Sequence, residues 1–211
     1  MKLKVINIEG SSSQDIELSE KIFSLNPNKT LIQSLVDWQL NHFKPRTAKT
    51  KQRGEIAGST SKIYAQKGTG GARHSSRKAP IFVGGGIAHG PKGNVYKIKK
   101  INKKVRKIAL AQTISKKNYD KNLHILADVK KEIKKTKEFN NFLKKNNLLN
   151  VVIISDIETI KNINKSARNI KDLKIINDAG ANIYDMMKYK NVLLTQSSIR
   201  NLEKRILNEK N

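Results

Sequence analysis

The residues best suited to chemistry in this sequence are the lysines and arginines of its middle third. Residues 44–107 contain eighteen Lys and Arg side chains and a single acid, Glu55. Cations at this density neutralise phosphates, and nucleic acid is the polyanion whose charge density matches them. The same stretch holds ten of the twelve glycines, which let a backbone approach phosphates closely. These two features predict a segment that binds nucleic acid.

Three kinds of side chain in this stretch suit RNA. Lys and Arg would bind phosphates, hydroxyls would donate to phosphate or ribose oxygens, and aromatic rings would stack on unpaired bases. The aromatic candidates are Tyr64, Phe82 and Tyr96. His74 and His89 lie among glycines and cations, with no cysteine and no nearby acid. They therefore indicate hydrogen bonding to phosphate or base rather than a metal site.

The basic segment, defined here as residues 45–95, shows no sustained period of a helix or a strand. With this charge and few large apolar residues, we expect it to be mostly unstructured until a polyanion orders it. A solvated basic segment without fixed contacts is the competing interpretation. Against it, the segment is internal, and Ile81, Phe82, Val83 and Ile87 predict a local apolar cluster. Structured RNA is favoured over duplex DNA because no recognition helix is visible.

Regular patterns flank the basic segment on both sides. Apolar spacing predicts strands and helices in alternation, which is typical of an α/β fold with a mainly parallel sheet flanked by helices. Residues 151–154 are apolar at every position, as expected of a strand covered on both faces. The predicted strands are 2–8, 123–127, 150–154, 173–176 and 191–195, and the predicted helices are 28–44, 102–119, 137–147, 158–168, 183–189 and 197–208.

The sequence therefore predicts a globular α/β domain formed by residues 1–44 and 96–211. The basic segment is inserted near its N-terminal third as a long extended loop. In the helix before the insertion, Leu31, Leu35, Trp38 and Phe43 follow one face, and Pro45 ends the helix. Trp38 is interpreted as part of the core and not as a platform for a base.

The groups that an enzyme would need are not arranged for catalysis. The glycines at 68–71 have neither the preceding strand nor the following helix of a dinucleotide-binding turn. The sequence has no apolar run long enough to span a membrane and no basic amphipathic helix with a Trp/Phe/Leu face, and its first residues indicate a strand rather than a signal peptide. We expect no cofactor, metal, small-molecule substrate or membrane partner. The acids near predicted strand ends form no paired-carboxylate motif: Asp156, Glu158, Asp172, Asp178 and Asp185.

A long motif extends over three parts of the basic segment. It reads Gln-Lys-Gly-Thr-Gly-Gly-Ala-Arg at residues 66–73, Arg-Lys-Ala-Pro-Ile-Phe-Val-Gly-Gly-Gly at 77–86 and His-Gly-Pro at 89–91. It strongly resembles the loop of the large ribosomal subunit protein four family, bacterial or organellar type, and the resemblance extends over nearly the whole chain. It implies a non-catalytic structural protein of the large subunit that supports its assembly. It also implies a loop that threads through ribosomal RNA, with a tip that lines the constriction of the nascent-peptide exit tunnel.

The resemblance further implies the partners and the place of action. The partners are large-subunit rRNA and other large-subunit proteins, including the one that shares the tunnel constriction. The location is the ribosome of the cytoplasm, or of an organellar matrix or stroma. Ala65 stands where an arginine is usual in the family, and Gly71 where a second one is frequent, so the tip carries less charge.

Matching positions assign the tip to Tyr64–Arg73, with Gln66, Lys67, Gly68 and Thr69 nearest the tunnel. The other candidate RNA-binding residues are Arg46, Lys49, Lys51, Arg53, Lys62, Tyr64, Gly70, Arg73, Arg77, Lys78, His89, Lys92, Lys103 and Arg106. Two other functions remain possible from the sequence. A free RNA chaperone or regulator would use the same segment, whereas an RNA-acting nuclease or nucleotide-dependent enzyme lacks a candidate site.

Overall fold

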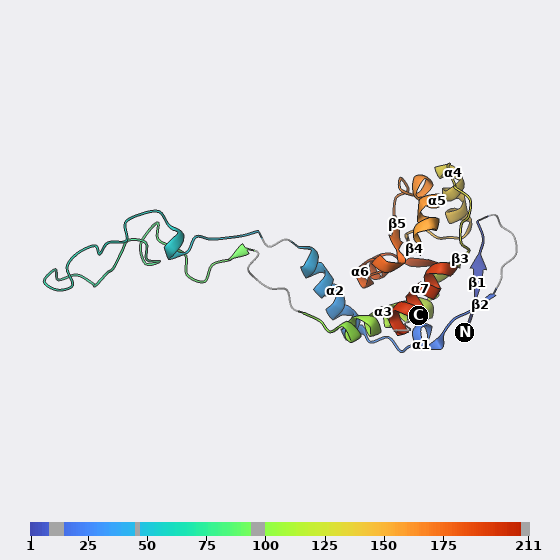
Figure 1. The fold of residues 1–211 in the computed structure, drawn as a ribbon, viewed down its shortest axis with the longest axis horizontal. Helices are drawn as coiled ribbons and strands as arrows, with labels where there is room; N and C mark the ends of the chain where they lie inside the picture. The colour runs from blue at the N-terminus through green and yellow to red at the C-terminus, as the bar shows by residue number, and fades with distance from the viewer. Residues whose placement is uncertain (9–14, 45–46, 94–99, 208–211) are drawn as a thin grey trace. The chain divides into compact units, whose positions relative to one another are not determined.

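The computed structural model describes residues 1–8, 15–44, 47–93 and 100–207. They divide into two compact units, one formed by residues 1–40 and 100–211 and the other by residues 41–99. The first unit contains every β-strand of the described chain and nearly all of its helical residues (Figure 1). The chain boundaries predicted for the basic segment, after residue 44 and before residue 96, stay predictions.

Six strands form one sheet in the order β2-β1-β3-β6-β4-β5. β1 and β2 are antiparallel, and all other neighbouring pairs are parallel. This arrangement confirms the predicted mainly parallel α/β sheet. The strands are β1 (Lys2–Ile6), β2 (Asp15–Glu17), β3 (Leu123–Leu126), β4 (Val151–Ser155), β5 (Leu173–Asn177) and β6 (Asn191–Thr195).

Helices cover both faces of the sheet, as Figure 1 shows for α4 and α5 on one side and α3 and α7 on the other. Parallel strands need such crossover helices, which is why strand and helix alternate along the chain. The helices are α1 (Glu20–Phe23), α2 (Lys29–Phe43), α3 (Lys103–Tyr119), α4 (Thr136–Lys145), α5 (Ile157–Ala167), α6 (Ile183–Lys188) and α7 (Gln196–Leu207), and the short turns are η1 (Arg53–Glu55) and η3 (Asp178–Gly180).

The alternation of side chains along the central strands separates two apolar clusters. Val152 and Ile154 of β4 pack with α1, α2, α3, α6 and α7, whereas Val151 and Ile153 pack with α4 and α5. All four side chains are buried, which confirms that this strand is covered on both faces. Neither cluster contains a residue of the described range 47–93.

Three local features differ from the sequence interpretation. The short elements β2 and α1 were not predicted, although Ile22 and Phe23 of α1 are fully buried. Phe43, in the last turn of α2, was expected on the buried face of its helix, but its side chain is 66% exposed and belongs to neither apolar cluster. Trp38 packs against the first apolar cluster, as predicted, but its side chain is only partly buried.

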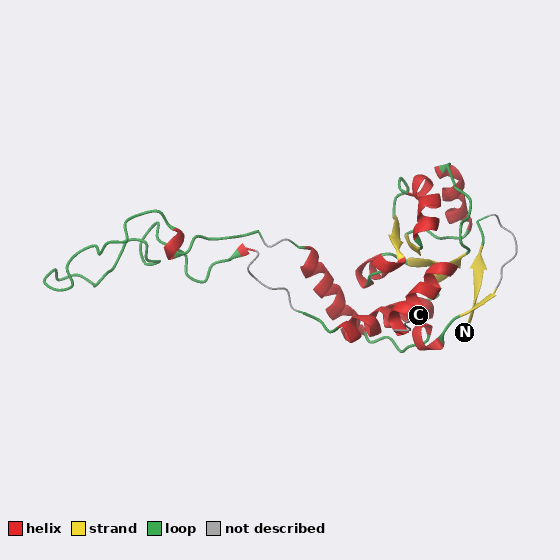
Figure 2. Ribbon diagram, in the orientation of Figure 1, coloured by secondary structure: helices red, strands yellow, loops and turns green. Residues whose placement is uncertain are grey.

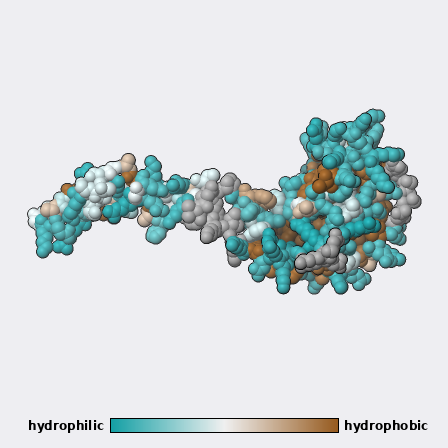
Figure 3. Space-filling model, viewed as in Figure 1, coloured by the Kyte–Doolittle hydropathy of each residue, from teal (hydrophilic) through white to brown (hydrophobic). Residues whose placement is uncertain are grey.

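The regular backbone structure of residues 47–93 is limited to the turn η1, an isolated bridge between Lys49 and Lys92, and 3-10 geometry at Gly93. Loop backbone makes up nearly all of this stretch in Figure 2. Its surface in Figure 3 is mainly hydrophilic, with the intermediate colour of glycine and few hydrophobic atoms. A stretch with this surface has little apolar area to bury against itself.

Candidate nucleic-acid interface

Two legs of the unit formed by residues 41–99 run side by side and are joined by backbone hydrogen bonds. The Thr50 amide donates to the Pro91 carbonyl at 2.9 Å, the Ile87 amide to Lys51 at 3.0 Å, and the Gly93 amide to Ala48 at 2.8 Å. We call residues 48–53 and 86–93 the stem. These bonds involve backbone atoms only, and the cationic side chains of the stem are exposed.

The stem requires glycine at residue 86, where its two legs come close together. A Cβ atom on Gly86 would overlap the backbone of Arg53 and Gln52, so only glycine fits at this position. The Gly86 amide also donates to the Lys78 carbonyl at 3.0 Å, which fixes the chain leading into the stem. The glycine enrichment visible in the sequence therefore has a local packing reason here as well as an advantage for phosphate contact.

Beyond the stem, the chain makes a second crossing near the predicted tip. The Ile63 amide donates to the Ser75 carbonyl at 2.9 Å, and the Lys62 ammonium donates to the Gln66 side-chain oxygen at 2.7 Å. The tip turns through two glycines with positive φ, Gly68 at 86° and Gly70 at 65°. Side-chain atoms at these positions would strain the backbone, so the turn depends on glycine.

Three aromatic rings pack together, one at the start of the predicted tip and two in the chain that follows it. The His74 ring is edge-on to Tyr64, with centroids 6.3 Å apart, and to Phe82, with centroids 4.8 Å apart. The Tyr64 hydroxyl also donates to the Ala72 carbonyl. Sequence reasoning treated these three residues separately, as stacking or phosphate-binding groups, and missed their mutual packing because nothing in their spacing indicates a contact.

The predicted apolar cluster at residues 81–87 is wrong. The side chains of Ile81, Val83 and Ile87 are all exposed, and only Phe82 is half-buried. The Phe82 amide donates a hydrogen bond to the Ala79 carbonyl, and the Gly85 amide donates one to the Phe82 carbonyl. These bonds form two successive tight turns, in which neighbouring side chains point outward instead of together.

Residues 47–93 contain nine Lys and Arg side chains but only one acid. The Glu55 carboxylate accepts from the Gln52 amide at 3.1 Å and pairs with the Lys49 ammonium at 3.1 Å. The amide hydrogen bond, followed by the bond to Lys49, lowers the pKa of Glu55 below its ordinary value. Since one carboxylate neutralises at most about one cation, the positive charge of this stretch is almost wholly uncompensated.

The structure leaves the predicted site residues accessible. Among the described candidates, Tyr64 and Lys78 are half-buried and the others are exposed. Arg46 and the predicted stacking residue Tyr96 lie outside the described residues. Lys103 and Arg106 belong to α3, in the other unit.

Three of the five acids near the strand ends, Asp156, Asp178 and Asp185, have structural partners. Both carboxylate oxygens of Asp185 accept from the Lys174 ammonium at 2.7 Å, and one accepts from the Asn182 amide at 2.8 Å. Burial opposes ionisation of Asp156, but hydrogen bonds from neighbouring hydroxyls outweigh it and lower the pKa of this carboxyl. Within the described ranges, no three His, Asp or Glu side chains meet in a way that could hold a metal ion.

A search for membrane-spanning helices gives a negative result for the part of the chain that the structure describes. None of its helices is both long enough and apolar enough to cross a bilayer.

Known ribosomal proteins are similar to this chain over most of its length. The sequence matches the ribosomal protein L4/L1 family over residues 16–205. This chain belongs to that family. It is 50% identical over 206 residues to the large ribosomal subunit protein uL4 of Pelagibacter ubique, covering 97% of this chain and 99% of the relative. It is 39% identical over 201 residues to uL4 of Desulforapulum autotrophicum, covering 95% and 96% of the two chains. It is also 39% identical to uL4 of a Bradyrhizobium strain, covering 97% and 99%.

Proposed function

We propose that this protein is a structural constituent of the large ribosomal subunit, where it binds large-subunit rRNA and supports assembly. As a member of a family of ribosomal proteins it is a structural protein and not an enzyme. The observation that carries the proposal is the uncompensated charge of residues 47–93, nine cations with one acid on an exposed, glycine-rich backbone. A surface of this kind is stable in contact with phosphates, which replace the solvent counterions.

In this proposal the basic segment is an extended loop inserted into the globular domain. The stem cations bind rRNA phosphates along both legs, and the tip, Gln66–Thr69, lines the nascent-peptide exit tunnel. Support comes from the narrow spacing of the legs, which only glycine at residue 86 permits, and from the two positive-φ glycines that turn the tip. Other large-subunit proteins, including the one at the same constriction, are the protein partners. The site of action is the cytoplasmic ribosome.

Co-sedimentation tests the proposal against that of a free RNA chaperone or regulator. Lysate from cells that make the tagged full-length chain is centrifuged through a sucrose gradient at low salt. We expect the protein to travel with large subunits and to stay with them after ribosomes are split at low magnesium. A protein that remains in the soluble fraction while ribosomes are intact would be a regulator instead.

The tip assignment predicts an effect on drugs that bind in the tunnel. Lys67→Glu reverses a charge at the tunnel wall, so the sensitivity of ribosomes to macrolides should change while subunit assembly largely survives. Growth inhibition by a macrolide and the yield of large subunits are measured together. Lys137→Glu on α4 is the control, because that lysine is exposed on the globular unit. An unchanged drug response of the Lys67→Glu ribosomes would contradict the tip assignment.

A further inference from the structure

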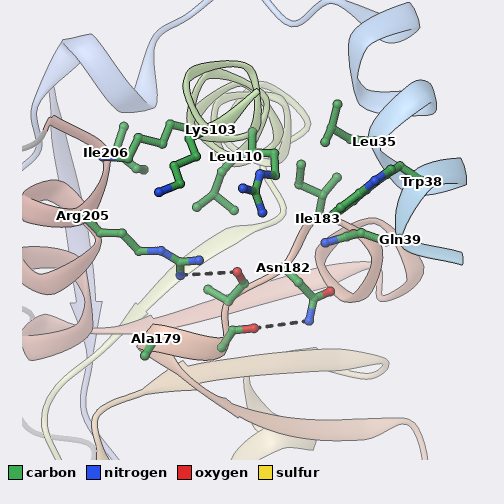
Figure 4. Close-up of a pocket in the computed structure, with 14 residues that line it drawn as sticks. Leu35, Trp38, Gln39, Lys103, Leu110, Ala179, Asn182, Ile183, Arg205 and Ile206 are labelled. Carbon is green, nitrogen blue, oxygen red and sulfur yellow. Dashed lines mark hydrogen bonds between the residues drawn. The ribbon is translucent and has the colours of Figure 1, made fainter. Parts of the chain in front are cut away.

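A cavity of about 360 Å³ lies within the globular unit, lined by residues of α2, α3, α6, α7 and η3 (Figure 4). Its apolar wall includes Leu35, Leu110, Ile183 and Ile206. Pockets that hold small ligands have volumes of roughly 300–1,000 Å³ and combine an apolar lining with a few convergent polar groups. The cavity therefore has the size and the construction of a ligand site. Sequence reasoning missed it because its walls come from four separate parts of the chain.

All the charged residues that line the cavity are positive. Lys103, Arg106, Lys107 and Arg205 line the cavity, and none of its lining residues is an acid. Arg205 Nη1 donates to the backbone oxygens of Asp178 at 3.0 Å and Ala181 at 3.4 Å, which hold the guanidinium in place without neutralising it. No ion pair within the described ranges involves Lys103, Arg106 or Arg205. The lining thus favours an anionic occupant.

An aromatic and two amide side chains complete the cavity. The indole of Trp38 lies across from Lys103 and Arg205 in Figure 4, and the guanidinium carbon of Arg106 is 5.5 Å from its ring centroid. Gln39 accepts from the Tyr184 amide at 2.8 Å, and Figure 4 shows its amide nitrogen turned toward the cavity. Asn182 also lines the cavity, but its amide is used by hydrogen bonds with Gly180 and Asp185. A flat base would contact the indole and the guanidinium, while the Gln39 amide would meet its edge.

We propose that this cavity holds one unpaired nucleotide of large-subunit rRNA, with its base against Trp38 and its phosphate among Lys103, Lys107 and Arg205. The inference rests on the proposed function, because it adds a second rRNA contact on the globular unit. An acidic peptide would satisfy the cations, but it would leave the aromatic and amide groups without a role. Recognition of a base that is splayed out from its strand uses all three kinds of group.

Trp38 is the only tryptophan in the chain, so its fluorescence reports on the cavity alone. The full-length protein is titrated with the four nucleoside 5′-monophosphates, with ribose 5-phosphate and with an oligoglutamate peptide at constant ionic strength. We expect quenching by at least one nucleotide and little by ribose 5-phosphate. Lys103→Gln should weaken that nucleotide about tenfold. Lys161→Gln, an exposed lysine of α5, should leave the titration unchanged.

Two outcomes would overturn the inference. Quenching by oligoglutamate but not by any nucleotide would assign the cavity to an acidic protein partner. Unchanged Trp38 fluorescence in a complex that still forms with large-subunit rRNA would show that the cavity holds no base, and the proposed function would stand. Failure of the proposed function is a separate result, since the protein would then not co-sediment with large subunits whatever the cavity binds.

Discussion

Replacing residues 60–90 by a short Gly–Ser linker should lower the affinity for large-subunit rRNA on the order of 10³-fold at moderate salt, while the globular unit stays folded. The replacement removes five cations, Lys62, Lys67, Arg73, Arg77 and Lys78. It removes nothing from the two apolar clusters, whose members lie at or before Trp38 and from Ile101 onward. Filter binding measures the affinity, and thermal unfolding followed by circular dichroism measures the folding.

A charge-neutral variant separates charge from length. Changing the same five cations to Gln in the full-length chain keeps the backbone path and should weaken rRNA binding nearly as much as the replacement does. If this variant bound rRNA as tightly as the parent, the affinity would depend on the shape of the segment and not on its phosphate contacts. If the linker variant instead lost its cooperative unfolding transition, the boundary of the basic segment would be misplaced.

Phe139→Ala should destabilise the globular unit by about 3–5 kcal/mol, and lower its Tm by roughly 10 °C. The Phe139 ring on α4 is fully buried and packs 6.0 Å, centroid to centroid, from Phe142. It belongs to the cluster on the α4 and α5 face of the sheet, so its removal leaves a cavity that rigid strands cannot close. Chemical unfolding in urea gives the free energy of unfolding directly.

Ile157→Ala is the matched control for this substitution. The Ile157 side chain at the start of α5 is 58% exposed, so we expect its loss to change stability by less than about 0.5 kcal/mol. A loss below about 1 kcal/mol for Phe139→Ala would mean that α4 does not form part of the core as described.

Periodicity was sufficient to predict most of the globular unit. The uniformly apolar run at 151–154 predicted a strand covered on both faces, and β4 has that environment. Long amphipathic patterns likewise predicted α3, α5 and α7. Periodicity failed for β2 and α1, which have three and four residues and so give no repeat to detect. It also failed at Phe43, because a pattern shows which face a residue occupies but not where the core ends.

The candidate sites could be predicted only in part, and from charge and composition instead of periodicity. Charge and composition alone indicated the basic segment, since an excess of cations is visible without any fold. The packing of His74 between Tyr64 and Phe82 was not visible, because it follows from the turns of an irregular backbone. The cavity at Trp38 was not visible either: residues 35–39, 103–110, 179–183 and 205–206 meet only through the sheet order and helix crossings.

The salt dependence of rRNA binding by the full-length chain tests the central claim most directly. If about ten of its cations contact phosphates, the logarithm of the binding constant should fall against the logarithm of salt concentration with a slope of about −7 to −9. A slope of only about −1 to −2 would show that few phosphates are bound, and that the charge of the basic segment is not what holds this protein to rRNA.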